Sequence, residues 1–279
     1  MTTDSKDLNL ALFCDFENVA LGVRDAKYAK FNIQLVLERI LLKGSIVVKK
    51  AYCDWERYKD FKATMHDAAF ELIEIPHTRQ SGKNSADIRM VVDALDLCYT
   101  KEHIDTFVII SGDSDFSPLV SKLRENAKTV IGVGVKNSTS ELLTNNCDEF
   151  IYYDDLQRDA QTIKRVRKKQ AVKKPTKKDG ASTNNPDLPK QEEASIDDAI
   201  QLILETVEGL LSDKGDGEKL WGSMVKQTLK RRRPGFNERF YGARSFSDLL
   251  EEAESRGLLK LEADERSGGY TIKLTENEN

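Results

Sequence analysis

The chain has 279 residues, of which 39% are hydrophobic and 32% charged, enough for one large domain or two ordinary ones. No segment reaches the roughly 20 apolar residues of a membrane helix and no signal peptide is evident, so we expect a cytoplasmic protein without a membrane partner. The net charge of −4 argues against a general polyanion binder. The charge is unevenly distributed, however: residues 156–194 carry a net charge of +6, whereas residues 1–155 carry −6 and residues 195–279 carry −4.

Residues 1–155 alternate apolar runs with amphipathic stretches. The apolar runs predict strands at 8–16, 45–53, 71–76, 106–113 and 129–135, with a short sixth candidate at 150–153. The amphipathic stretches predict helices at about 31–43, 57–70, 86–98, 116–127 and 138–145. Several runs are apolar throughout, as expected for strands covered on both sides. The pattern predicts an α/β fold, a parallel sheet with helices on both faces.

Residues 156–194 break this alternation. They are rich in Lys, Arg, Pro, Asn and Ser and hold almost no large apolar residue after Val172. This composition predicts a flexible basic linker, with a helical extension up to about Val172. Its basic residues are either a solvated tether or a contact to phosphate groups.

Residues 195–279 form a second predicted domain. Amphipathic helices are expected over 196–211, from Glu218 to Pro234, and over a third segment that begins at Ser245 or Ser247 and ends at Gly257. Two apolar segments joined by DERSGG then predict a β-hairpin. Three helices followed by a hairpin predict a small winged-helix domain.

Carboxylates gather where predicted strands end. Asp15 follows the first strand, and Asp113 follows the fourth with Asp115 two residues later. Ligands of an open parallel sheet bind beyond the carboxyl ends of its strands, so Asp15 and Asp113 are expected at one edge. Asp115 has an alternative explanation, because it also suits a helix N-cap.

Asp87 is placed at the same edge by the phase of the helix predicted over 86–98. The apolar stripe of that helix is expected to be buried and comprises Ile88, Val91, Val92, Leu95 and Cys98. Asp87 flanks the N-terminal end of this stripe, whereas Asp93 is expected on the opposite, solvent-facing side.

Clustered carboxylates repel one another unless a cation lies among them. Hard oxygen ligands suit Mg²⁺ or Mn²⁺. Two such ions about 4 Å apart can activate a water and stabilise the leaving oxygen of a phosphodiester. The chain has three histidines, none in these motifs, and four cysteines without a C-x-x-C pair, so a zinc site or disulfide framework is not expected.

Four segments carry a family resemblance, which runs through nearly all of residues 8–155. They are CDFEN (14–18), ADIRMVVDAL (86–95), SGDSDF (111–116) and IGVGV (131–135). Together they resemble the NYN domain, a LabA-like branch of the PIN-domain ribonucleases. The resemblance implies divalent-metal-dependent cleavage of RNA, with the acidic ligands at Asp15, Asp87, Asp113 and Asp115. Asn18 matches the Asn of the family's D-x-x-N pattern and is expected to bind a metal-bound water or a phosphate.

Other substrate-binding candidates lie near these motifs. Lys83, in the loop before Asp87, either meets a phosphate or is a solvated loop lysine. Ser111 and Ser114 flank Asp113 and are candidates for phosphate contacts, although serine is common in turns. Arg79 and Lys136 are weaker candidates. Gly132 and Gly134 lie in a strand without the G-x-G-x-x-G arrangement, which argues against dinucleotide binding.

The C-terminal segment resembles the OST-HTH (LOTUS) domain over residues 196–274, most specifically in PGFNERFYGARSFSDLLEEAE. That resemblance implies RNA binding. The candidate contacts form one basic run, Lys230, Arg231, Arg232 and Arg233. The aromatic residues Phe236, Phe240 and Phe246 beside it are either stacking platforms or core residues.

Three functions follow as hypotheses. The first is a metal-dependent ribonuclease whose linker and C-terminal module retain RNA. The second is a non-catalytic RNA-binding adaptor, and the third is a DNA-binding regulator in which the winged helix reads the major groove. The RNA target, a protein partner and a homo-oligomeric state all stay open.

Overall fold

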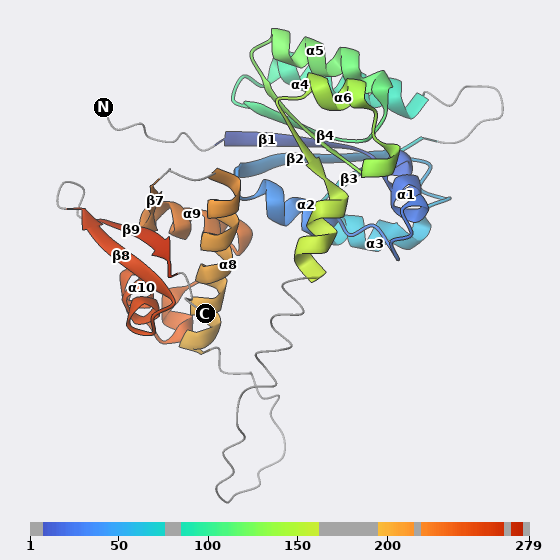
Figure 1. Cartoon of the computed structure of the whole chain (residues 1–279). Coiled ribbons are helices and arrows are strands. Elements are labelled where there is room, and N and C mark those ends of the chain that lie inside the picture. Colours follow the sequence, from blue (N-terminus) through green and yellow to red (C-terminus); the bar gives the residue numbers. More distant parts are fainter. Residues whose placement is uncertain (1–7, 76–84, 162–194, 215–218, 265–268, 276–279) are drawn as a thin grey trace, which may run out of the picture. The chain divides into compact units, whose positions relative to one another are not determined.

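The computed structural model describes residues 8–75, 85–161, 195–214, 219–264 and 269–275 (Figure 1). The chain divides into two compact units, Met1–Lys168 and Lys169–Asn279, and each has its own hydrophobic core. A helix begins at residue 153, and its described part ends at 161. The rest of the predicted linker lies outside the described residues. Within the described part of the chain, no helix is long and apolar enough to cross a membrane.

The first unit contains a six-stranded sheet in which every strand pair is parallel. Its strands are β1 (Leu8–Asp15), β2 (Gly44–Cys53), β3 (Glu71–Glu74), β4 (Thr106–Ile110), β5 (Thr129–Gly134) and β6 (Glu149–Tyr152). They lie in the order β3-β2-β1-β4-β5-β6. The parallel sheet predicted from the apolar runs is therefore confirmed.

Helices cover both faces of this sheet (Figure 1). One face carries α1 (Phe16–Asp25), α2 (Ile33–Ile40) and α3 (Lys59–Asp67), and the other carries α4 (Ser85–Thr100), α5 (Ser117–Glu125) and α6 (Glu141–Asn146). Successive strand side chains point to opposite faces, so Leu12 packs into the first core and Phe13 into the second. This double burial explains why the central strands are apolar throughout.

Helix α1 is absent from the sequence-based prediction. The apolar run continues from β1 through Phe16, so the strand was expected to extend one residue too far. In the structure the backbone turns at Asp15, whose side chain accepts a hydrogen bond from the backbone N–H of Asn18. Asp15 is thus both the last residue of β1 and the N-cap of α1.

The predicted phase of α4 is partly wrong. Cys98 is buried as expected, and Val91 and Leu95 are partly buried against the core. Ile88 and Val92, however, are 63% and 55% exposed, whereas Met90 and Ala94, which were not in the predicted stripe, are fully buried. The centre of the buried face is formed by the small and sulfur-containing residues Met90, Ala94 and Cys98, and two aliphatic residues lie outside that face, so hydrophobicity alone misplaces its centre. Asp87 lies one turn before Met90 and therefore on the sheet-facing side.

The solvent-facing position predicted for Asp93 is also wrong. Its side chain is only 14% exposed. It accepts hydrogen bonds from Tyr52 Oη at 2.9 Å and Arg89 Nε at 2.9 Å, and Lys50 Nζ lies 3.5 Å away. These partners compensate its charge, so Asp93 anchors α4 to β2.

The second unit contains helices packed on a separate antiparallel sheet. Its elements are α8 (Ile196–Lys214), β7 (Leu220–Trp221), α9 (Gly222–Arg232), η3 (Glu238–Tyr241), α10 (Phe246–Ser255), β8 (Leu259–Asp264) and β9 (Gly269–Leu274). The three long helices and the hairpin follow the predicted order. Ser245 caps α10 in a capping box with Asp248, and Gly257, with φ of +70°, follows the end of that helix. The short strand β7 was predicted as part of a helix.

Candidate active site

The strand order of the first unit reverses between β1 and β4. The connections from β1 and β2 run over one face of the sheet, whereas those from β4 and β5 run over the other. Neighbouring crossovers that diverge in this way leave a crevice at the carboxyl ends of the two strands. Asp15 ends β1, and Cys14 pairs with Ile110, the last residue of β4. Asp113 follows three residues later, so both aspartates lie at this edge.

Ser111 joins the two central aspartates. Its hydroxyl donates to Asp15 Oδ2 at 3.0 Å and accepts from the backbone N–H of Asp113 at 3.2 Å. The residue is fully buried, so its hydroxyl is not placed to contact a substrate. The sequence suggested a phosphate contact, whereas the geometry gives Ser111 a positioning role, because it fixes the Asp15 carboxylate relative to the loop after β4.

Asn18 and Gly112 hold the same loop from the other side. The backbone N–H of Gly112 donates to Asn18 Oδ1 at 2.9 Å, and the carbonyl of Gly112 accepts from the N–H of Ser140 at 2.9 Å. A β-carbon at Gly112 would lie 2.3 Å from the carbonyl oxygen of Ser138. The amide oxygen of Asn18 therefore already holds the loop after β4 to α1, and the Gly112 carbonyl holds the same loop to the one after β5.

Asp113 and Asp115 share a single turn beyond β4. Asp113 caps the short helix η1 (Ser114–Phe116), and its Oδ1 accepts from the backbone N–H of Asp115 at 3.0 Å. Asp115 is exposed, whereas Asp113 and Ser114 are partly buried. The capping function expected for Asp115 thus belongs to Asp113, which leaves the Asp115 carboxylate at the surface.

The electrostatics bring Asp87 into this group. Burial, followed by the charge of Asp87, raises the pKa of Asp15 to about 7, although hydrogen bonds from Ser111 and Asn18 lower it. Burial and the charges of Asp113, Asp115 and Glu17 raise the pKa of Asp87 to about 6. The charged neighbours that raise these two pKa values are all acidic. Among the described residues, negative charge is therefore concentrated around Asp15 and Asp87.

Glu17 is an acidic residue of this edge that the sequence-based reasoning missed. It lies in the first turn of α1, two residues after Asp15, and its Oε1 is 3.1 Å from Arg57 Nη1. Its place in the CDFEN segment was a usable signal, but α1 itself was not predicted. The ion pair with Arg57 distinguishes Glu17 from Asp15 and Asp87.

A divalent cation fits the chemistry of these donors. Carboxylate oxygens are hard ligands, and a cation among them would relieve the repulsion that raises the pKa values of Asp15 and Asp87. Among the residues that the structure describes, no group of three or more His, Cys, Asp or Glu side chains is closely enough placed to hold a metal. Mg²⁺ often binds through one or two carboxylates and several waters, so such a closed set is not required.

The remaining candidates in this unit have different positions. Lys83 and Arg79 lie outside the described residues. Lys136 Nζ is 2.8 Å from Asp155 Oδ1 and lies over the ring of Tyr152. Gly132 and Gly134 admit no β-carbon, because Phe150 and Thr139 fill the space beside them.

The basic run of the second unit lies at the end of α9. Arg231 donates to Thr228 Oγ1 at 2.9 Å, and Arg232 donates to Thr206 Oγ1 at 3.3 Å. Both are partly buried, whereas Lys230 and Arg233 are exposed. Arg232 therefore joins α9 to α8, whereas the Arg231 bond stays within α9.

The aromatic residues near this run divide into two classes. Phe236 and Phe246 are buried in the core, 6% and 5% exposed, whereas Phe240 is 67% exposed. Arg232 and Arg233 line a hollow of about 390 Å³ together with Phe236 and Tyr241. Of the three phenylalanines, Phe240 is the one accessible for stacking.

Comparison with known proteins identifies the first unit. The family model described as "NYN domain" matches residues 9–155, more than half of the chain. The chain belongs to the NYN-domain family. NYN domains form part of the PIN-like nuclease superfamily, and the six-stranded parallel sheet agrees with that fold.

Related proteins do not add an established activity to this NYN protein. An uncharacterized protein of Methanocaldococcus jannaschii is 28% identical over 164 residues, which cover 57% of this chain and 65% of the relative. The match thus spans slightly less than two thirds of that relative's length. A crystal structure of a protein of unknown function from Vibrio parahaemolyticus is 26% identical, covers 56% of this chain and 98% of its own, and superposes with a TM-score of 0.49.

Proposed function

We propose that this NYN protein is a divalent-metal-dependent endoribonuclease. The observation that carries the proposal is the gathering of Asp15, Asp87, Asp113 and Asp115 at the reversal point of the sheet, where burial and acidic neighbours raise the pKa values of Asp15 and Asp87. Such a group attracts a cation, and a cation in turn attracts a phosphodiester. These four aspartates would supply the carboxylate ligands of Mg²⁺ or Mn²⁺, with waters completing the coordination.

Each residue of the site has a defined task in this proposal. When bound, the metal would supply an activated water and stabilise the leaving oxygen of the phosphodiester. Ser111 fixes the orientation of the Asp15 carboxylate, and Asn18 holds the backbone of Gly112. The exposed Asp115 marks the side from which a strand would enter. Preorganisation by buried hydrogen bonds lowers the cost of arranging these groups for the reaction.

RNA retention is assigned to the basic parts of the chain. Residues 156–194 carry a net charge of +6, and Lys230 and Arg233 are exposed at the end of α9. Phosphate contacts by such groups give salt-dependent binding without sequence preference. We propose that the second unit is an OST-HTH (LOTUS) winged helix that binds single-stranded or structured RNA, and that the protein acts in the cytoplasm.

Asp87→Asn tests whether α4 contributes to the site. We expect cleavage of labelled single-stranded RNA in Mn²⁺ to fall about 100-fold or more, because a metal ligand is lost while the helix persists. Asp96→Asn is the matched control, since Asp96 is exposed on the same helix and loses the same charge. Equal cleavage by the two variants would remove Asp87 from the active site.

A second candidate function is a non-catalytic RNA-binding adaptor. It is favoured by the absence, within the described ranges, of a ready-made group of three metal-binding side chains. The same assay decides between the two: an adaptor retains RNA but shows no turnover with Mg²⁺, Mn²⁺ or any other divalent ion. Preference of the full chain for duplex DNA over RNA would instead indicate a DNA-binding regulator.

A further inference from the structure

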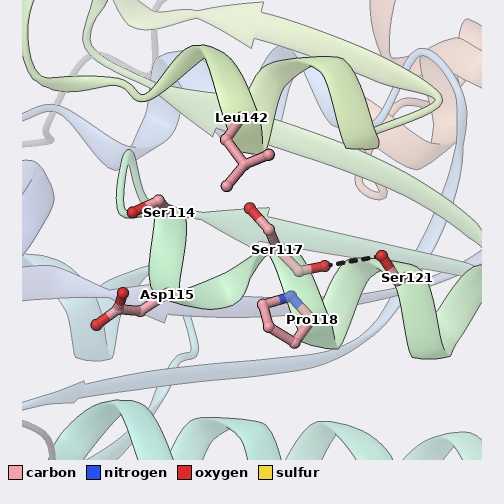
Figure 2. Close-up of a pocket in the computed structure, with 6 residues that line it drawn as sticks. All are labelled: Ser114, Asp115, Ser117, Pro118, Ser121 and Leu142. Carbon is pink, nitrogen blue, oxygen red and sulfur yellow. Dashed lines mark hydrogen bonds between the residues drawn. The ribbon is translucent and has the colours of Figure 1, made fainter.

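A hollow lies beside the acidic group, between η1, α5 and α6 (Figure 2). Its volume is about 460 Å³, within the usual range for small-molecule sites. It is lined by six residues of the first unit: Ser114, Asp115, Ser117, Pro118, Ser121 and Leu142. Ser114 and Asp115 directly follow Asp113, so the hollow adjoins the proposed active site.

Ser117 has an unpartnered hydroxyl at this place. The residue is 6% exposed, and its Oγ is buried without a hydrogen-bond partner. Its backbone carbonyl accepts from Ser121 Oγ at 3.1 Å, whereas its own hydroxyl points toward Leu142 (Figure 2). A buried hydroxyl without a hydrogen-bond partner destabilises the folded protein. A bound group that displaces the side chain of Leu142 would satisfy it.

Leu142 is suited to such a movement. It is a large apolar side chain that is 57% exposed, near the start of the short helix α6 (Glu141–Asn146). Exposed side chains change rotamer readily. With the exposed Pro118 it gives one side of the hollow an apolar surface.

The lining selects an uncharged ligand. Its described lining residues include the carboxylate of Asp115 and neither lysine nor arginine, so they would repel a phosphate group. The remaining polar groups are serine hydroxyls, which both donate and accept hydrogen bonds. Apolar surface on one side and hydroxyls on the other suit a flat base joined to a sugar.

We propose that this hollow binds one nucleoside of the RNA strand, next to the phosphate held at the aspartates. The base would lie against Leu142 and Pro118, and the ribose hydroxyls would meet Ser114 and Ser117. The inference rests on the proposed ribonuclease function. It adds a subsite that favours ribose over deoxyribose, because a 2′-hydroxyl would give the Ser117 hydroxyl the hydrogen-bond partner that it lacks.

Ser117→Ala separates binding from folding. We expect a melting temperature equal to or above that of the wild type, because the substitution removes an unsatisfied buried hydroxyl. We also expect KM for single-stranded RNA to rise roughly fivefold with kcat nearly unchanged, and the preference for ribose at one position of a chimeric strand to shrink by a similar factor. An unchanged KM, or a loss of melting temperature alongside the loss of affinity, would overturn the subsite.

A second measurement does not depend on cleavage. In Asp113→Asn protein with ¹³C-labelled leucine methyl groups, single-stranded RNA in Mg²⁺ should shift the Leu142 methyl signals, and DNA of the same sequence should shift them less. Leu142→Ala should weaken RNA binding, whereas Val47→Ala, at an exposed apolar position in the first half of β2, should not. If the wild type cleaves no RNA, the nuclease proposal fails, and the Leu142 signals still decide the subsite. Unperturbed Leu142 signals at saturating RNA would overturn it.

Discussion

Asp15→Asn is expected to stabilise the metal-free protein above about pH 7 while abolishing RNA cleavage. In the folded protein Asp15 has a pKa of about 7, whereas an unperturbed aspartate has a pKa of 3.8. Between these values the folded state binds more protons than the unfolded chain, so the free energy of unfolding of the wild type falls as pH rises. The loss amounts to roughly 4 kcal/mol at most, and Asp87, with its raised pKa, adds a change of the same sign.

Asparagine removes the ionisation of residue 15 but keeps the shape of the side chain. It also weakens one hydrogen bond, from Ser111 or from the N–H of Asn18, at a cost of about 1 kcal/mol. We therefore expect a net gain of about 2 kcal/mol at pH 8, equivalent to about 5 °C in melting temperature, and little change at pH 4. Thermal unfolding in EDTA over this pH range measures the effect.

The same pair of proteins gives a metal control. Mn²⁺ should raise the melting temperature of the wild type at pH 8 and have much less effect on Asp15→Asn, because the ion compensates the buried charge only where that charge exists. A variant that is less stable than the wild type at every pH would contradict the electrostatic role assigned to Asp15. Full cleavage by the variant would contradict its catalytic role.

Gly112→Ala is expected to have the largest destabilising effect of any single methyl addition at the site. The new carbon would lie 2.3 Å from the carbonyl oxygen of Ser138 and 3.0 Å from the α-carbon of Thr139, both of which belong to the backbone. The two loops must separate, which strains the hydrogen bonds that Gly112 makes with Asn18 and Ser140. We expect a loss of about 3 kcal/mol in denaturant unfolding and a displaced Asp113 with low activity.

Gly235→Ala serves as the control for this substitution. No atom lies within 4 Å of the position that a β-carbon would take at Gly235, so the unfolding free energy should change by less than about 1 kcal/mol. If Gly112→Ala unfolds at the wild-type denaturant concentration and cleaves RNA normally, the close packing of the two loops is not what positions Asp113.

The parallel sheet could be predicted because its central strands are continuous runs of apolar residues. Val108 and Ile110 face one core and Phe107 and Ile109 the other, so β4 reads as an unbroken apolar run. Helix α1 was not predictable in the same way, because Phe16 extends the apolar run of β1 although it already belongs to the helix. Strand β7 is only two residues long, too short for a periodicity.

The sequence predicts some parts of the candidate site more directly than others. The position of Asp15 and Asp113 follows from strand ends in a parallel sheet, a rule that depends on topology alone. The prediction for Asp87 used a helix phase that was only partly right, since Met90 and Ala94 face the sheet and Ile88 and Val92 do not. The role of Ser111 depends on two hydrogen bonds that no sequence pattern encodes.

The central claim is that the aspartates after β1 and β4 form a metal-dependent nuclease site that acts on RNA. Its most direct test is cleavage of mixed labelled RNA and DNA by the full chain in Mn²⁺, comparing the wild type with Asp113→Asn. We predict that the wild type cleaves RNA, that EDTA stops the reaction, and that Asp113→Asn cleaves at least about 100-fold more slowly while still binding RNA. Equal cleavage by the two proteins, or no cleavage by the wild type with any divalent ion, would contradict the claim.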